Sequence, residues 1–195
     1  MPFHFPVLSG LTIRIRAIRR EDANLLAGIT SLDTFKYYVT CVPTSDEPEG
    51  WQPFVDYILN TPTIHGQVIE DLQTGQILGM SNYLDIREID RQVEVGMTWY
   101  IEERRGTRLN PEAKLLDLTH AFEALNCVKV TLKADDRNAH SKAAILKLGA
   151  KPEGLFKSHR LTPWGEFRDT AWFAIMAEDW PTVKAGLLSR LERQS

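Results

Sequence analysis

Hydrophobic and polar residues alternate along several stretches of the chain, a pattern typical of strands with one buried face. The clearest stretches are residues 11–18 and 92–100. In the second, the alternation predicts one face made of Val93, Val95, Met97 and Trp99 and another made of Glu94, Gly96, Thr98 and Tyr100. Further strands are expected at residues 63–70, 76–84, 128–132, 154–161 and 166–176, the last two joined as a hairpin over residues 163–165.

Apolar residues recur every three or four positions in the intervening stretches, which predicts helices. One helix follows Asp22 as N-cap, and residues 31–62 hold one or two more with a loop at residues 43–48. The next has Asn110 as N-cap, with Pro111 and Glu112 in its first turn. Residues 138–148 form another helix ended by Gly149, and a last helix follows residue 179. This order predicts an α+β fold, a mixed, mostly antiparallel sheet flanked by helices, formed by residues 1–195 as a single domain.

Composition narrows the class of protein. The chain has 195 residues, 43% of them hydrophobic, and a net charge of −3, so it can bury a core but does not have the basic charge of a nucleic-acid-coating protein. Two cysteines, Cys41 and Cys127, are too few for a disulfide scaffold. The first ten residues lack the basic start of a signal peptide, and no apolar run approaches a membrane span. We therefore expect a cytoplasmic protein with neither nucleic acid nor membrane as partner.

The most informative loop comes between the strand at residues 92–100 and the following helix. It carries Arg104, Arg105 and Arg108 around Gly106 and leads into a helix N-terminus, where free N–H groups and the helix dipole attract anions. These features indicate a pyrophosphate-binding turn. An ordinary polar loop before a well-capped helix is the alternative. The glycine and lysine pattern of a P-loop is absent.

The run RRGTRLNPEAKLLDLTHAFEAL that starts at residue 104 resembles the acyl-CoA-binding segment of the GCN5-related N-acetyltransferases, in particular their ribosomal-protein-alanine acetyltransferase-like branch. Three further motifs match in the expected order: VEVG at residues 93–96, RNAHSKAAILKLGA at 137–150, and the two hairpin strands at 153–160 and 165–175. The resemblance covers nearly the whole chain, from about residue 11 to residue 180.

The resemblance implies a twisted sheet whose fourth and fifth strands, here residues 92–100 and 128–132, part like a V and hold acetyl-CoA as cosubstrate, without a metal. It implies that backbone groups of Thr98, Trp99 and Tyr100 pair with the pantetheine arm as an added strand would. Arg105 matches the leading residue of the family's phosphate loop. The pyrophosphate would be held by the backbone N–H groups of Gly106, Thr107, Arg108, Leu109 and Asn110. Arg108 and Asn110 depart from the family pattern, because small residues are usual at both positions.

Acyl transfer to an amine requires removal of a proton, because an amine with a pKa near 10.4 is almost fully protonated at neutral pH. Glu94 is the candidate base, acting through a water, on the strand that would carry the acetyl group. A pairing of Glu94 with Arg91 or with solvent is the alternative. The backbone N–H of Met97 or Thr98 would polarise the thioester carbonyl.

In many members of the family a tyrosine protonates the leaving thiolate. The matching position in this sequence is Ile145. Ser141 could donate to the sulfur instead, or it could simply satisfy a backbone group of the helix. Asn138 would bond the pantetheine amide region, or act as a plain N-cap. The local excess of positive charge at residues 129–147 suits the 3′-phosphate of the cofactor.

Other candidates are weaker. Phe35, Tyr37, Tyr38 and Trp51 line the acceptor side of the cleft or belong to the core. The histidines show no metal spacing, and His120 is expected to be structural. Residues 159–160 and 168–169 would form a hairpin ion-pair cluster.

We therefore expect an N-acetyltransferase that moves the acetyl group of acetyl-CoA directly to a primary amine, either a protein N-terminus or a small molecule. A non-catalytic acyl-CoA sensor on the same fold and a simple interaction domain remain alternatives. Exposed apolar residues of the last helix and the hairpin would allow a homodimer.

Overall fold

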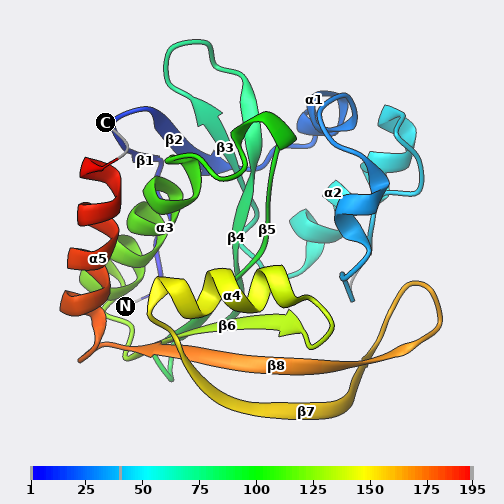
Figure 1. Cartoon of the computed structure of the whole chain (residues 1–195). Helices are drawn as coiled ribbons and strands as arrows, with labels where there is room; N and C mark the ends of the chain where they lie inside the picture. Colours follow the sequence, from blue (N-terminus) through cyan, green and yellow to red (C-terminus); the bar gives the residue numbers. More distant parts are fainter. Residues whose placement is uncertain (1, 40, 194–195) are drawn as a thin grey trace.

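An eight-stranded sheet organises the computed structural model, which describes residues 2–39 and 41–193. The strand order is β1-β2-β3-β4-β5-β6-β8-β7, and only the β5–β6 contact is parallel (Figure 1). The α+β fold with a mixed, mostly antiparallel sheet is confirmed. The strands are β1 (Leu8–Ser9), β2 (Ile13–Ala17), β3 (Gln67–Asp71), β4 (Ile77–Arg87), β5 (Gln92–Tyr100), β6 (Lys129–Asp135), β7 (Lys151–Leu161) and β8 (Phe167–Met176).

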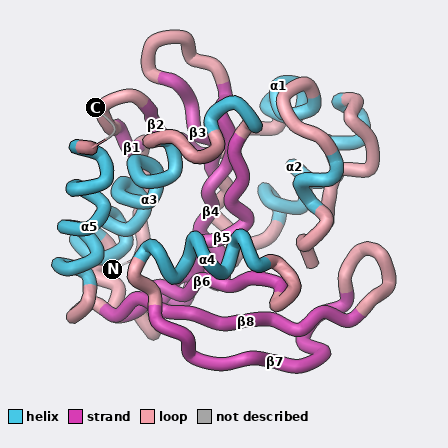
Figure 2. The backbone as a smooth tube through the Cα atoms, in the orientation of Figure 1, coloured by secondary structure: helices cyan, strands magenta, loops and turns pink. Residues whose placement is uncertain are grey.

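Helices lie on either side of this sheet (Figure 2). The α-helices are α1 (Asp22–Ala27), α2 (Pro48–Asn60), α3 (Leu109–Thr119), α4 (Ala139–Leu148) and α5 (Trp180–Glu192). Short 3-10 helices, η1 (Leu32–Phe35) and η2 (Glu102–Arg104), lie in connections, and a π-helical segment, η3 (His120–Ala124), continues α3. Helices α3 and α5 lie side by side, whereas α1 and α2 lie at the other end of the molecule (Figure 1).

Two clusters of buried apolar residues form the core. The first joins α1, α2, η1 and the start of α3 to strands β2–β5 and includes Trp51, Phe54 and Trp99. The second joins α3, α4 and α5 to strands β5, β6 and β8 and includes Val93 and Val130. The two clusters meet the sheet at β5, so this strand is where both halves of the core are anchored.

Strands β5 and β6 separate soon after they begin. They pair only from Gln92 to Glu94 on β5, opposite Lys129 to Thr131 on β6. Beyond Glu94, β5 stays paired with β4, and β6 stays paired with β8. The split between the two strands is the V-shaped opening that the resemblance implied.

A bulge in β5 changes the predicted alternation. Met97 has a φ of 46°, and two residues of β5, Met97 and Thr98, lie between the pairs that flank Ser81 of β4. The faces expected at residues 93–99 are therefore wrong beyond Gly96. Val93 belongs to the second core cluster, whereas Trp99 belongs to the first.

Several predicted boundaries also change. Helix α3 begins at Leu109, so Arg108 is its N-cap position and Asn110 is not. Asp22 is likewise the first residue of α1 rather than its cap, and its carboxylate binds Arg16 at 2.7 Å. Asn138 caps α4 as predicted, and Gly149 ends it at a φ of 106°. Strand β6 extends to Asp135, three residues further than the apolar run indicated.

Candidate functional site

The split exposes one edge of β5 to a possible ligand. From Val95 to Tyr100 this strand has β4 on one side and, among the described residues, no strand on the other. The Asn82 side chain supports the bulge by donating to the Met97 carbonyl at 2.9 Å. Unpaired backbone groups of β5 therefore face the split, as an extended chain added beside the strand would require.

An ion pair bridges the base of the split. Glu94 is the last paired residue of β5, and its carboxylate lies 2.6 Å from the Lys133 ammonium of β6. Both side chains are largely buried, at 12% and 15% exposure. The Lys133 ammonium also lies 3.9 Å from the centre of the Trp172 ring, a cation–π contact. The alternative pairing of Glu94 with Arg91 is not seen, because Arg91 bonds the Asn126 carbonyl.

Burial dominates the electrostatics of Glu94. It raises the pKa of the carboxyl above its ordinary value, although the nearby Lys133 charge opposes that shift. A carboxylate with a raised pKa is a better proton acceptor near neutral pH. The geometry and the direction of the pKa shift therefore both suit a general base at this position.

Polar groups continue from this pair along β8 and β7. The buried Arg168 donates to the Thr170 hydroxyl at 3.1 Å and to the Tyr37 carbonyl at 2.7 Å. The His159 ring also contacts that hydroxyl at 3.1 Å. The expected hairpin ion-pair cluster is wrong, because Asp169 pairs with Lys157 while Arg168 and His159 turn to Thr170.

Only one of the three loop arginines is left for an anion. Arg104 pairs with Asp71 at 3.4 Å, and Arg108 pairs with Glu112 at 3.3 Å. Arg105 donates to the Tyr100 carbonyl at 3.1 Å and, among the described residues, has no carboxylate within 4 Å. Arg105 is therefore the loop cation best placed to serve a phosphate.

The backbone of the loop fits a phosphate group. Gly106 has a φ of 75°, which favours glycine, and a Cβ added there would meet no protein atom within 4 Å. The first bond of α3 runs from the Glu112 N–H to the Arg108 carbonyl, so earlier N–H groups are not used within the helix. Of these, the Leu109 N–H bonds the Thr107 hydroxyl at 3.3 Å. The larger Arg108 and Asn110 side chains are held by partners, Glu112 and the Tyr100 hydroxyl respectively. Their departure from the family pattern is therefore compatible with a phosphate cradle.

A buried polar network fixes α3 against the sheet, and no pattern in the sequence indicated it. The Lys114 ammonium lies 2.8 Å from the hydroxyls of both Ser81 and Thr98, and Ser81 donates to Asp117 at 2.6 Å. Burial lowers the pKa of Lys114 to about 8 and raises that of Asp117 to about 6. The Thr98 side chain is therefore occupied, and only its backbone remains for a ligand.

Helix α4 begins shortly after β6, the second of the two strands that border the split. The Asn138 side chain accepts from the Ser141 N–H at 3.0 Å, as an N-cap does. Ser141 is half-buried, and its hydroxyl has no hydrogen-bond partner within the described chain that would fix its direction. Ile145 is buried in the second core cluster.

Core packing accounts for three of the four aromatic candidates, because Tyr38 packs against the first core cluster, which contains Phe35 and Trp51. Phe35 and Trp51 are buried in the first core cluster, and the Tyr37 carbonyl accepts from Arg168. The His120 ring bonds the His4 carbonyl at 2.9 Å, which agrees with a structural role. The basic excess at residues 129–147 is largely neutralised, because four of its five cations pair with carboxylates: Lys129, Lys133, Arg137 and Lys142.

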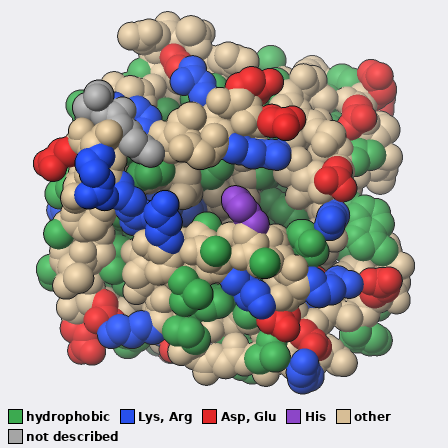
Figure 3. Space-filling view, in the orientation of Figure 1, with side chains coloured by type: hydrophobic (Ala, Val, Ile, Leu, Met, Phe, Trp, Pro, Cys, Tyr) green, Lys and Arg blue, Asp and Glu red, His purple; other side chains and the backbone are tan. Residues whose placement is uncertain are grey.

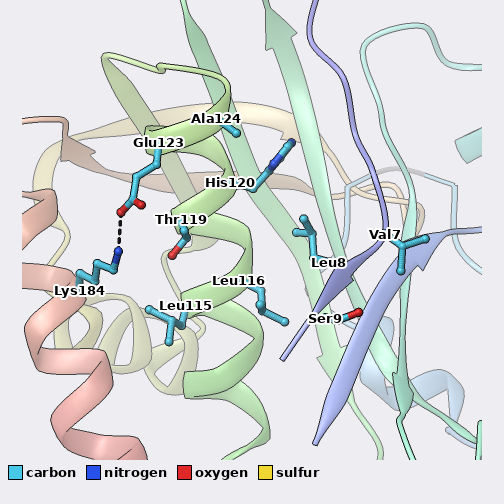
Figure 4. A pocket seen from close by; sticks show the side chains of 10 residues that line it. All are labelled: Val7, Leu8, Ser9, Leu115, Leu116, Thr119, His120, Glu123, Ala124 and Lys184. Carbon is cyan, nitrogen blue, oxygen red and sulfur yellow. Dashed lines mark hydrogen bonds and ion pairs between the residues drawn. The ribbon is translucent and has the colours of Figure 1, made fainter. Parts of the chain in front are cut away.

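A separate cavity of about 580 Å³ lies between β1, α3 and α5, away from the split (Figure 4). Its two charged side chains, Glu123 and Lys184, pair with each other at 2.7 Å. Within residues 2–39 and 41–193, no group of histidine, cysteine, aspartate or glutamate side chains could hold a metal ion. The helices in the same part of the chain are too short or too polar to span a membrane.

Comparison with known proteins agrees with this geometry. The model of the acetyltransferase (GNAT) domain matches residues 12–151. The chain therefore belongs to the GNAT acetyltransferase family, and it is an acetyl-CoA-dependent N-acyltransferase. A search of curated proteins by sequence gives no match.

Solved structures show the same fold. A proposed acetyltransferase from T. thermophilus is 28% identical, with a TM-score of 0.89 over 97% of this chain and 100% of that one. RimJ from Mycobacterium smegmatis, in complex with CoA-disulfide, is 21% identical, with a TM-score of 0.72 over 91% and 88% of the two chains. The ribosomal-protein-S5-alanine acetyltransferase from Vibrio fischeri is 20% identical, with a TM-score of 0.67 over 90% and 99%. These neighbours include the RimJ-like branch that the sequence motifs resemble.

Proposed function

We propose that the enzyme transfers the acetyl group directly to a primary amine, either the N-terminus of a protein or a small molecule, without an acyl-enzyme. The observation that carries this proposal is the buried Glu94–Lys133 pair at the base of the split. It places a carboxylate with a raised pKa next to the strand edge that the cofactor would occupy. The acetyltransferase family of the chain favours this enzyme over a non-catalytic sensor.

Glu94 accepts a proton from the ammonium of the acceptor, through a water molecule, so that the neutral amine can act as nucleophile. Acetyl-CoA supplies the acetyl thioester, whose carbonyl carbon is the electrophile. A backbone N–H at the bulge, of Met97 or Thr98, donates to the carbonyl oxygen as negative charge develops there. Lys133 stays paired with Glu94 while the carboxylate accepts this proton through the water.

The cofactor would be held by backbone groups more than by side chains. Thr98, Trp99 and Tyr100 offer the free edge of β5 to the pantetheine arm. Arg105 and the N–H groups from Gly106 to Asn110 would hold the pyrophosphate, which the open space at Gly106 supports.

Two residues of α4 would complete the cofactor site. The Asn138 amide group would contact the pantetheine arm while it caps the helix. The Ser141 hydroxyl would donate a hydrogen bond to the sulfur as the thiolate leaves. Because Ile145 carries no proton to donate, Ser141 is the group of α4 that we assign to this step.

The whole chain, we further propose, acts as one cytoplasmic domain that forms a homodimer. A single sheet crosses the described chain from β1 to β7, which supports one domain. The low cysteine content of the sequence, two residues in 195, is typical of proteins in a reducing compartment. Exposed apolar side chains at the end of the β7–β8 hairpin support self-association.

Glu94→Gln tests the proposed base. We expect turnover near neutral pH to fall at least about tenfold, because the amide cannot accept the proton. The affinity for CoA, measured by calorimetry, should stay within about twofold, since Glu94 is not among the residues that hold it. Glu153→Gln is a matched control, because it breaks a lysine–glutamate pair at 2.6 Å outside the split. Unchanged turnover of the Glu94 variant would reject the role.

A further inference from the structure

A groove of about 370 Å³ lies between the end of α4 and the length of α5, and strongly basic side chains line it. Its charged residues are Lys147, Lys151, Arg190, Arg193 and a single carboxylate, Asp179. Basic side chains gather on this face of the molecule near α5 (Figure 3). Such a concentration of one sign of charge favours binding of an anion.

Most of this positive charge is not neutralised within the protein. Lys151 pairs with Asp179 at 2.7 Å, but the other three cations have no carboxylate within 4 Å among the described residues. Within the described part of the chain, Arg190 and Arg193 donate to neutral oxygens, of Gly186 and Ser189. Burial and the neighbouring charge of Arg193 both lower the pKa of Arg190. An anion placed between the two arginines would relieve this repulsion.

The groove lies beside the phosphate cradle of the candidate site. Trp180 and Lys184, near the start of α5, both donate to Glu123, which follows the end of α3. The two helices therefore run antiparallel, and Figure 1 shows them packed along their length. The end of α5 that carries Arg190 and Arg193 consequently lies next to the start of α3, where Gly106 to Asn110 precede the first helical bonds.

We propose that the groove between α4 and α5 binds the 3′-phosphate of coenzyme A through Arg190 and Arg193, with Lys147 at its edge. This inference rests on the proposed function, which places the pyrophosphate at the start of α3. Arginine suits the role, because its guanidinium can donate two parallel hydrogen bonds to one phosphate. Of the residues 129–147 that were expected to supply this charge, only Lys147 is kept, since the other four cations are already paired among the described residues.

Calorimetry with CoA and dephospho-CoA tests the inference on the whole protein. The two ligands differ only in the 3′-phosphate. We expect the wild type to bind CoA at least about tenfold more tightly, and Arg190→Gln/Arg193→Gln to bind both ligands with the weaker affinity. Arg19→Gln/Arg20→Gln removes the same charge from exposed positions before α1 and should keep the preference.

The outcomes separate the possible roles of the arginines. Cations also stabilise the C-terminal end of a helix. If that is their only role, the double variant will lose thermal stability but keep the wild-type preference for CoA, which would overturn the inference. Equal binding of both ligands by the wild type would overturn it while leaving the acetyl-CoA site intact. Absence of binding by either ligand would instead reject the proposed function.

Discussion

At the scale of single residues, burial and the neighbouring Lys133 ammonium have opposite effects on the charge state of Glu94. Burial raises the pKa of the carboxyl, and the Lys133 ammonium at 2.6 Å lowers it. Trp172 keeps the ammonium in place through its ring face. In the proposed mechanism Lys133 is therefore a positioning residue, because it would act on the reaction through Glu94.

Lys133→Met should move the pH profile. A base must be deprotonated, so kcat/KM falls as the pH drops through the pKa of Glu94. Because methionine removes the cation that lowers this pKa, we expect the acidic limb to shift to higher pH. Lys129→Met, which removes the partner of Glu153 instead, should leave the limb in place. An unchanged limb in the Lys133 variant, with circular dichroism showing a folded protein, would contradict this role.

The sequence indicated Glu94 as the candidate base but did not indicate Lys133 as its partner. Alternation placed Glu94 on the polar face of a strand, and that face depends only on neighbouring residues. Lys133 comes 39 positions later along the chain, on a strand that meets β5 through a parallel pairing. Only the register of that pairing brings the two charges together, and a local pattern carries no information on it.

At the scale of elements, the bulge in β5 and the packing of α3 against the sheet together fix the backbone of β5 beside the split. Thr98, the residue after the bulge, bonds Lys114 of α3 at 2.8 Å. Lys114 lies 3.9 Å from Asp117 in the same network. The alternation of apolar and polar residues predicts a regular strand. It could not reveal the extra residue of the bulge, which is next to a contact with a helix distant in the sequence.

Lys114→Met should destabilise the protein more than the loss of an exposed pair would. It leaves the Asp117 carboxyl buried without its cation, which typically lowers the free energy of unfolding by about 3–5 kcal/mol. Adding Asp117→Asn should restore part of that loss, because the amide is neutral. Lys184→Met, which breaks an exposed pair with Glu123, should cost less than about 1 kcal/mol. Urea denaturation at neutral pH measures the free energy of unfolding of these variants and of Asp117→Asn alone. If the effects of Lys114→Met and Asp117→Asn simply add in the double variant, the two side chains are not coupled.

At the scale of the whole molecule, the β7–β8 hairpin is held against residues 36–37 by hydrogen bonds between segments about 130 positions apart in the sequence. Trp164 in its turn donates to the Lys36 carbonyl at 3.2 Å, and Arg168 donates to the Tyr37 carbonyl at 2.7 Å. The succession of strands and helices along the chain, including the hairpin, could be predicted, because each element has a local signal. These long-range contacts have none, which is why the sequence does not identify the acceptor.

The end of the hairpin also carries the prediction of a homodimer. Leu161, Trp164 and Phe167 are 53%, 55% and 66% exposed, and large apolar side chains grouped on a surface favour association. We expect sedimentation to show a dimer for the wild type and a shift toward monomer for Phe167→Lys, because the lysine would have to be desolvated at the contact. Ile89→Lys makes the same change at a residue 99% exposed in the β4–β5 turn and should leave the dimer intact. A monomer at every concentration would show that these side chains serve another contact, and equal dissociation of both variants would place the interface elsewhere.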